Sequence, residues 1–473
     1  MSKARRNSGQ PRQTRVAWAG FAAGLMIVTL IGLRPLGWIS TGTDCHGGKD
    51  GKDQELVVAT GAEVGAGGIR RRLIKEWNND PKKNIKARLV EISESTDEQR
   101  AEMVAAAQSG RCVYDVLLLD VAWTEEFARN GYIVPIPAEA LAGREFLPNS
   151  LETGKFENEQ YAVPFAADAP LLYVRNDGKN PPPPPRTVPD LLSSARNRGY
   201  AAQFSDYEGG TINLMEAILS GESTGTGGAE RIMDALKDSG KVLGTLEEWH
   251  DVATASNGDL REESSLQAFR SGYVGYMRNW PFAYRRLVMD PSMRNDQGGL
   301  KFDLQAFPGV GILGGVNLAI TRNSPHKKAA AELIGALTSP DAQRLLFACG
   351  GYAPVLESVY RDYAQVTGGA KTCGELLDGE TGEGDRSAEP ESEITTGQLR
   401  DFAEAVHQAV DRAVVRPKSA YYSTFSEVFR SCLLPVVLGS AVPPDFAEFA
   451  DALRDAMDGK RHSGDHCPAP PET

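Results

Sequence analysis

The stretch GGVNLAITRNSPHKKAAAELIGALTSPDAQRLLFACGGYAP (residues 314–354) carries the densest structural signal in the chain. Residues 316–321 read VNLAIT, a β-rich run that predicts a short strand after two glycines. Ser-Pro pairs at 324–325 and 339–340 each place an N-cap hydroxyl before a proline at the first helical position. The glycines at 350–351 then supply a left-handed stop. We therefore expect a strand followed by two packed helices.

Upstream of this stretch, strands and helices alternate along the chain. Apolar runs at 56–60, 87–92 and 114–119 read as buried strands, and residues 69–78 and 96–109 read as the helices between them. This order is typical of a parallel sheet covered by helices, so the predicted fold class is α/β. In such sheets, ligands bind beyond the carboxyl ends of the strands.

Four further segments join the first one in a family resemblance. They are DVLLLDVAWTEEFARNGYIVPI (115–136), YAVPFAADAPLLYVRND (161–177), FRSGYVGYMRNWPFAY (269–284) and VVRPKSAYYSTFSEVF (414–429). In this order, the five segments resemble extracellular solute-binding proteins of the carbohydrate ABC-importer type, which include maltose- and trehalose-binding proteins. The resemblance implies a two-lobed, periplasmic-binding-protein-like α/β fold with a hinge and a ligand cleft between the lobes.

The resemblance also implies how the chain divides between the lobes. Lobe one is expected to hold residues 54–163 and 308–356, and lobe two is expected to hold residues 164–307 and 357–458. Within the last range, residues 366–396 are acidic and rich in glycine, which predicts a mobile insertion.

The two ends of the chain differ from its body. Residues 1–15 carry five basic side chains and no acidic one, and a largely apolar segment follows at 16–39. Its uncharged core is long for a signal peptide and short for a spanning helix, so an uncleaved membrane anchor and a cleaved or lipidated signal are both open. Either one implies export to the outer face of the cytoplasmic membrane. Residues 40–53 are expected to be a polar linker, and residues 459–473 a disordered tail.

Charge and cysteine content narrow the choice of partners. The net charge of −12 argues against a nucleic-acid partner, since binding phosphates requires concentrated positive charge. Six cysteines without a C-x-x-C pair are compatible with disulfides in an oxidising compartment. We expect at least one disulfide to use two of Cys349, Cys373 and Cys432. The motif H-x-x-x-H-C at 462–467 could hold a metal, but it lies in the polar tail, so we expect no metal site.

The segments that carry the resemblance also supply candidate ligand contacts. Sugars present flat C–H faces and rims of hydroxyls, which aromatic rings and charged or amide groups recognise. Trp280 lies in a segment that resembles the family segment whose tryptophan stacks on ligand, and Arg416 resembles an arginine that reaches sugar hydroxyls. The expected ligand-binding residues are Glu63, Asp120, Trp123, Asp168, Tyr207, Glu208, Trp280, Gly314, Gly315, Asn317 and Arg416.

Each candidate also has a purely structural alternative. An aromatic ring can belong to the core, and an acid at a strand end or in a loop can be a helix cap or a surface charge. For Arg416 the alternative is an ion pair with a nearby acid. If Trp280 and Arg416 line the cleft, replacing either one by alanine should weaken ligand binding and leave the fold intact.

Motifs of catalysis are missing from the sequence. It contains no G-x-S-x-G, H-E-x-x-H or phosphate-loop motif, so we expect a binding protein that is not an enzyme and uses no cofactor. The resemblance implies a monomer that binds a sugar or oligosaccharide and delivers it to ABC permease subunits, and through them to their ATPase. The alternatives are a membrane-tethered receptor domain of the same fold and, less favoured, a glycosidase.

Overall fold

The computed structural model describes residues 55–93, 95–177, 183–220, 228–255, 260–364, 370–378, 394–460 and 467–468. The expected basic segment, apolar segment and linker lie outside these residues, as does most of the acidic insertion. Among the helices described, none combines the length and apolar character that crossing a membrane requires.

The first sheet is built from six strands. They are β1 (Glu55–Thr60), β2 (Lys86–Glu91), β3 (Val116–Asp120), β6 (Ala162–Asp168), β11 (Ile312–Ile320) and β12 (Val414–Val415). Their order is β12-β11-β3-β1-β2, and β6 also pairs with β11. β1 is parallel to β2 and to β3, as predicted, whereas β11 runs antiparallel to β3 and β6. We call this sheet with its helices lobe one.

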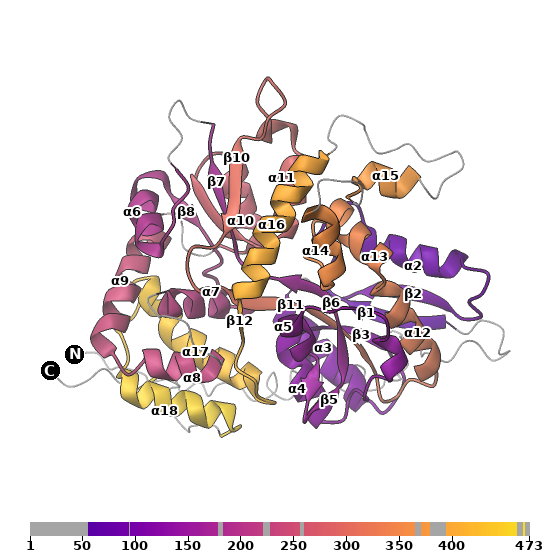
Figure 1. Cartoon of the computed structure of the whole chain (residues 1–473). Helices are drawn as coiled ribbons and strands as arrows, with labels where there is room; N and C mark the ends of the chain where they lie inside the picture. The colour runs from indigo at the N-terminus through magenta and orange to yellow at the C-terminus, as the bar shows by residue number, and fades with distance from the viewer. Residues whose placement is uncertain are drawn as a thin grey trace, which may run out of the picture. The chain divides into compact units, whose positions relative to one another are not determined.

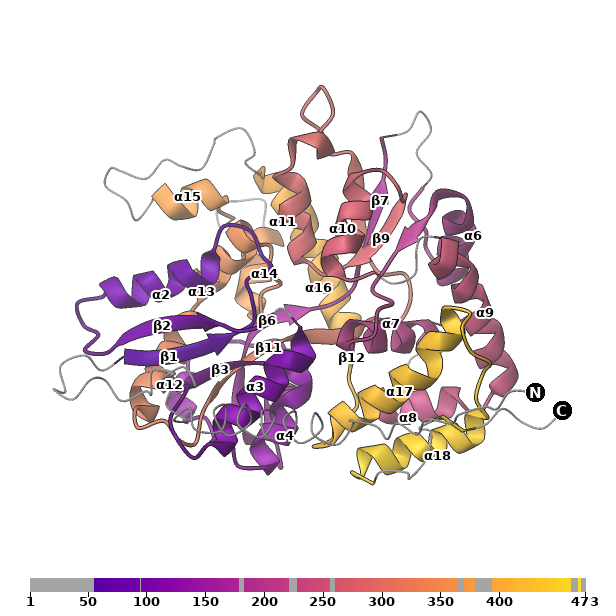
Figure 2. The ribbon, with the colours of Figure 1, turned by 180° about the vertical axis from the view of Figure 1, so that it is seen from behind.

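Helices cover both faces of the lobe-one sheet. They are α2 (Ile69–Asn79), α3 (Thr96–Gln108), α4 (Thr124–Arg129), α5 (Pro148–Glu152), α12 (Lys327–Leu337) and α13 (Pro340–Leu345), and a hairpin of β4 (Lys155–Phe156) and β5 (Glu159–Gln160) lies beside them. Leu56 and Val58 of β1 pack in one core with α2, whereas Val57 and Ala59 pack in a second core with α3 and α4. This alternation follows from the two-residue period of a strand. Figures 1 and 2 show α2 on one face and α3 with α4 on the other.

The first helix after β11 begins later than its Ser-Pro pair predicted. α12 starts at Lys327, so Pro325 is not at the first helical position and Ser324 is not the cap. The Ser324 hydroxyl instead donates to the buried carboxylate of Asp115 at 2.5 Å. Its oxygen also accepts from the His326 amide at 3.1 Å, so both of these interactions of Ser324 lie in the loop before the helix.

The second helix of the same stretch is confirmed. The Ser339 hydroxyl accepts a hydrogen bond from the Ala342 amide at 3.2 Å and caps α13, which continues as a π-helical turn at Leu346–Gly350. Gly351 then ends the helix with a φ of +76°, the left-handed conformation that glycine adopts without steric cost.

The second sheet has the strand order β10-β7-β9-β8, and we call it with its helices lobe two. Its strands are β7 (Leu171–Arg175), β8 (Tyr200–Ala201), β9 (Tyr276–Asn279) and β10 (Phe302–Ala306). Its helices are α6 (Val188–Arg198), α7 (Glu208–Leu219), α8 (Gly228–Ala235), α9 (Ser239–Ala255), α10 (Glu262–Arg270), α11 (Phe282–Val288), α16 (Thr396–Arg412), α17 (Tyr422–Val437) and α18 (Phe446–Met457). α17 packs against α7, α9 and α18, and α16 packs against β10 and β7.

The chain passes between the two sheets more than once. β6 pairs with β11 as far as Asp168, and the chain then enters the second sheet at β7. It returns between β10 and β11, over residues 307–311. β12 comes from the range assigned wholly to lobe two, yet it pairs with β11 at the edge of the first sheet. A two-residue strand is too short for its pairing to be recognised from sequence.

Two disulfides lie in the C-terminal third. Cys349 bonds to Cys373, at the start of α15 (Cys373–Asp378), which confirms the prediction that two of the three named cysteines pair. Cys432 of α17 bonds to Cys467. The tail is therefore tied covalently to lobe two at Cys467, and the sulfur of that residue is not available as a metal thiolate. α14 (Glu357–Ala364) packs between α13 and α16.

Candidate functional site at the junction of the lobes

Charged residues at or just after the ends of three other strands lie beside the first half of β11. Asp120, the last residue of β3, pairs with Val316, and Asp168, the last residue of β6, pairs with Gly314. Arg416 follows β12 directly, and β12 pairs with the first two residues of β11. Strand ends that are far apart in the sequence therefore meet around Gly314, next to the crossings between the lobes.

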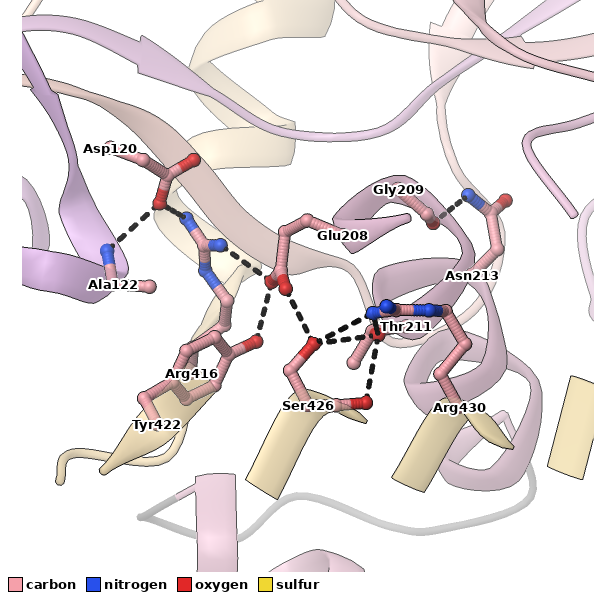
Figure 3. A network of polar contacts seen from close by, with 10 residues as sticks. All are labelled: Asp120, Ala122, Glu208, Gly209, Thr211, Asn213, Arg416, Tyr422, Ser426 and Arg430. Atoms are coloured by element: carbon pink, nitrogen blue, oxygen red, sulfur yellow. Dashed lines mark hydrogen bonds and ion pairs between the residues drawn. The ribbon is translucent and has the colours of Figure 1, made fainter. Parts of the chain in front are cut away.

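Arg416 joins the two lobes through ion pairs. Its Nη2 donates to Asp120 at 2.5 Å, and its Nη1 donates to Glu208, the first residue of α7 in lobe two, at 2.8 Å. Only 2% of the Arg416 side chain and 5% of the Glu208 side chain are exposed. Figure 3 shows the guanidinium between the two carboxylates. Arg416 therefore forms the ion pair with an acid that the sequence left open as its structural alternative.

The network continues into lobe two through α17. Tyr422 and Ser426 both donate to the Glu208 carboxylate at 2.6 Å. Arg430 donates to the Ser426 hydroxyl at 3.2 Å, and its Nη2 lies 3.8 Å from Asp97 in lobe one. Burial, and after it the negative charge of Glu208, raises the pKa of Asp97. Guanidinium and carboxylate groups thus bridge the lobes at two places, of which Figure 3 shows the one at Arg416.

The space beside Arg416 is too small for a sugar. A cavity of about 20 Å³ lies between Val121, Thr153 and Lys418, which is room for about one water molecule. Burial raises the pKa of Asp120, and the nearby guanidinium of Arg416 opposes this shift. Arg416 therefore acts first as a counter-ion for two buried acids.

Two candidate aromatics meet at a carboxylate that sequence reasoning did not select. Tyr207 donates to Oε2 of Glu262 at 2.7 Å, and the indole Nε1 of Trp280 donates to Oε1 of the same residue at 3.3 Å. The guanidinium carbon of Arg278 stands 3.8 Å from the Trp280 ring centroid. Burial raises the pKa of the Tyr207 phenol well above its usual value, so the phenol remains a donor.

Two further buried acids are Asp168, which lies beside Gly314 together with Trp280, and Glu63, which lies beside Arg70. Burial raises the pKa of Asp168 to about 7, although the positive charge of Arg70 opposes the shift. Oε1 of Glu63 accepts from the Arg70 amide at 3.0 Å, whereas its buried Oε2 has no hydrogen-bond partner among the described residues. Burial raises the pKa of Glu63 as well. The Arg70 guanidinium stands 5.2 Å from the ring centroid of Tyr352.

Gly314 and Gly315 lie in close contact with neighbouring segments at this point. A Cβ on Gly314 would lie 3.3 Å from the Asp168 Cβ, which is a tight contact, and 3.6 Å from the Trp280 ring, which is an ordinary one. Gly315 has a φ of +121°, and a Cβ there would lie 2.3 Å from the carbonyl oxygen of Ala166. The backbone at Gly315 therefore excludes any other residue without distortion.

Two predicted residues are not brought into this group. Trp123 is 2% exposed and packs in the lobe-one core that contains α3 and α4. Asn317 is fully buried and donates to Thr124 at 3.0 Å and to Thr153 at 3.1 Å. Both side chains are occupied by contacts within lobe one.

Sequence reasoning missed five residues that complete the arrangement. Tyr352 lies in the stretch 314–354, Arg278 is two residues before Trp280, and Tyr422 lies in the segment 414–429, so proximity to a recognised segment is the signal for these three. No local pattern marks the other two. The missed residues are Arg70, Glu262, Arg278, Tyr352 and Tyr422. Among the described residues, no group of three histidine, cysteine or acidic side chains could hold a metal ion.

Comparisons with known proteins agree with this architecture. The family model described as "Bacterial extracellular solute-binding protein" matches residues 73–369. A probable ABC transporter-binding protein of Deinococcus radiodurans is 25% identical over 303 residues, which cover 58% of this chain and 70% of that protein.

Solved structures share the fold at lower identity. MalE3 of T. maritima, with maltose bound, has a TM-score of 0.66 and 22% identity over 85% of this chain and 99% of that one. The GacH receptor of Streptomyces glaucescens, solved unliganded and with acarbose, has a TM-score of 0.63 and 19% identity over 86% and 99% of the two chains. These similarities establish the two-lobed α/β fold.

Proposed function

This chain belongs to the family of bacterial extracellular solute-binding proteins, and on that premise we propose that it binds a sugar or oligosaccharide between its two lobes. The bound sugar would then pass to ABC permease subunits. The family is one of exported binding proteins rather than enzymes, and we propose that this chain releases its ligand unaltered.

The observation that carries the proposal is the position of an aromatic ring beside a buried carboxyl group at the lobe junction. The Trp280 ring lies within contact distance of a Cβ placed on Gly314, which itself pairs with Asp168. A ring buries the C–H face of a sugar, and carboxylates accept hydrogen bonds from its hydroxyls. The buried Oε2 of Glu63 offers a second acceptor on the lobe-one side.

The site that we propose is a revised subset of the sequence candidates. Trp280 and Tyr207 form its lobe-two wall, and Asp168 and Glu63 supply acceptors from lobe one. Arg416 holds the two walls together through Asp120 and Glu208 in this proposal, because both of its terminal nitrogens already donate to carboxylates.

The first experiment is a thermal-shift screen of the protein against mono- and oligosaccharides, followed by calorimetric titration of the best ligand. Trp280→Ala should weaken binding by about 30-fold, since losing a buried stacking ring costs about 2 kcal/mol. Tyr273→Ala is the matched control, because Tyr273 is an aromatic residue shortly before β9 that is 60% exposed. If no saccharide shifts the melting temperature, or if the two variants bind alike, the proposed site is wrong.

The N-terminal segment adds a second testable part to the proposal. Its basic flank and apolar run predict that the chain partitions with membranes, with residues after the linker on the outside. Fractionation of expressing cells checks this, and recovery of only a mature, unlipidated protein in the medium would contradict the anchor. Chromatography of recovered ligand checks for turnover, because cleaved products would indicate a glycosidase.

A further inference from the structure

Glu262 connects the two aromatic residues of the lobe-two wall. It is the first residue of α10, where the positive end of the helix dipole favours a carboxylate. Each of its oxygens accepts from one ring, Oε2 from the Tyr207 hydroxyl at 2.7 Å and Oε1 from the Trp280 indole at 3.3 Å. Tyr207 and Trp280 are 95% and 92% buried and come from different elements, so the carboxylate is what ties their edges together.

The rest of Trp280 is also held in place. Its backbone N–H donates to the Asn279 side chain at 2.8 Å, and its carbonyl accepts from Tyr173 at 2.9 Å. The Arg278 guanidinium covers one face of the indole. Arg278 is itself fixed by two hydrogen bonds to Glu216, at 2.9 and 2.6 Å, within the core of lobe two. One face of the indole is therefore occupied by protein, so a ligand can stack at most on the opposite face.

We propose that Glu262 is a positioning residue of the ligand site, which sets the orientation of Trp280 and Tyr207 before ligand arrives. The inference rests on the proposed function, since it assigns a role within that site. Fixing a side chain in its bound orientation removes the entropy cost of ordering it on binding. Because Arg278 occupies the other face, Trp280 stacks on a single sugar ring from one side only.

Three variants separate positioning from charge and from general stability. Glu262→Ala removes both acceptors, and it should weaken sugar binding by about ten-fold because two rings must then be ordered on binding. Glu262→Gln should restore most of the affinity, since its amide oxygen can accept from the indole while its amide nitrogen donates to the tyrosine oxygen. Glu263→Ala is the matched control, because Glu263 is the next residue, is exposed and pairs only with Arg286 among the described residues.

A ligand-free measurement tests the same idea without the sugar. The emission of Trp280, obtained as wild type minus Trp280→Phe, should become more quenchable by acrylamide in Glu262→Ala and stay unchanged in Glu263→Ala. A melting curve for each variant confirms that it is folded. If Glu262→Ala does not fold, Glu262→Asp replaces it, with Glu263→Asp as its control. The aspartate side chain is one methylene shorter, so quenching should rise and affinity should fall in Glu262→Asp but not in Glu263→Asp.

The outcomes separate this inference from the proposed function. Unchanged quenching, or equal affinities for Glu262→Ala and Glu263→Ala, overturns the role of Glu262. Where Glu262→Asp is used, equal quenching and equal affinity of Glu262→Asp and Glu263→Asp do the same. Altered quenching in a protein that binds no saccharide supports the positioning of Trp280 and rejects the proposed ligand class instead.

Discussion

Replacing Arg416 by methionine is the sharpest test of the junction between the lobes. Methionine keeps much of the side-chain volume and removes the charge, which leaves the carboxylates of Asp120 and Glu208 without their common counter-ion. Removing one partner of a buried ion pair costs about 3–5 kcal/mol. Glu208 keeps its hydrogen bonds from Tyr422 and Ser426, so we expect the low end, about 3 kcal/mol.

A loss of this size is measurable by chemical and thermal unfolding. It should lower the melting temperature by about 5 °C or more, given roughly 2 °C per kcal/mol for a chain of several hundred residues. Lys418→Met is the matched control, because Lys418 lies two residues away and its pair with Glu152 is about half exposed, a pair worth less than about 1 kcal/mol. Equal stability of the two variants would refute our account of Arg416. The same loss revises the expectation that alanine at Arg416 leaves the fold untouched.

Three further predictions concern other parts of the molecule. Burial raises the pKa of Asp168 in the folded state to about 7. The stability that the protonated carboxyl contributes is therefore present below pH 4 and is lost as pH rises towards 7. Asp168→Asn should accordingly be more stable than wild type above pH 7. Urea midpoints between pH 4 and 8 measure this, and parallel profiles would count against it. Cys349→Ser should lower the free energy of unfolding by about 2–5 kcal/mol under oxidising conditions and leave it unchanged in reductant, where the bond to Cys373 is absent. Equal melting temperatures of the wild type with and without reductant would disprove this prediction. Gly315→Ala should lower the free energy of unfolding by about 1–3 kcal/mol, because its φ is unfavourable for alanine. Gly244→Ala, in open space on α9, should instead raise it by about 0.5–1 kcal/mol. The reverse order in thermal melts would contradict the strain at Gly315.

The fold was largely predictable because its signals are local. The alternation of apolar runs and amphipathic helices marked the parallel β1, β2 and β3, and Ser339 marked the cap of α13. Ser324, like Ser339, precedes a proline, but its hydroxyl donates a hydrogen bond to Asp115, a buried acid that lies nearby in space. That partner is 209 residues away in the sequence, so the local pattern could not reveal it.

For the proposed site, the sequence indicated which residues lie near one another better than it indicated their partners. Asp120 and Asp168 were recognised because they end strands, and strand ends of an α/β sheet gather at one edge. Whether a residue in a strand or just after one faces the junction or the core depends on which helices cover each face of the sheet. This is why Trp123, in the turn after β3, and Asn317, in β11, were not separated from the others. The pairs of Arg416 with Glu208 and Asp120 span 208 and 296 residues, which no motif encodes.

The disulfide between Cys432 and Cys467 has a practical consequence for following lobe motion. It ties the chain near residue 467 to α17, the helix that carries Tyr422 and Ser426 at the lobe junction. A fluorophore attached at position 468, next to this disulfide, would therefore report on lobe two. Paired with a second dye on an exposed helix of lobe one, such as α3, it would convert ligand-driven closure into a change in energy transfer. Reducing the disulfide would loosen the first dye and blur that signal, which gives the sensor its own internal control.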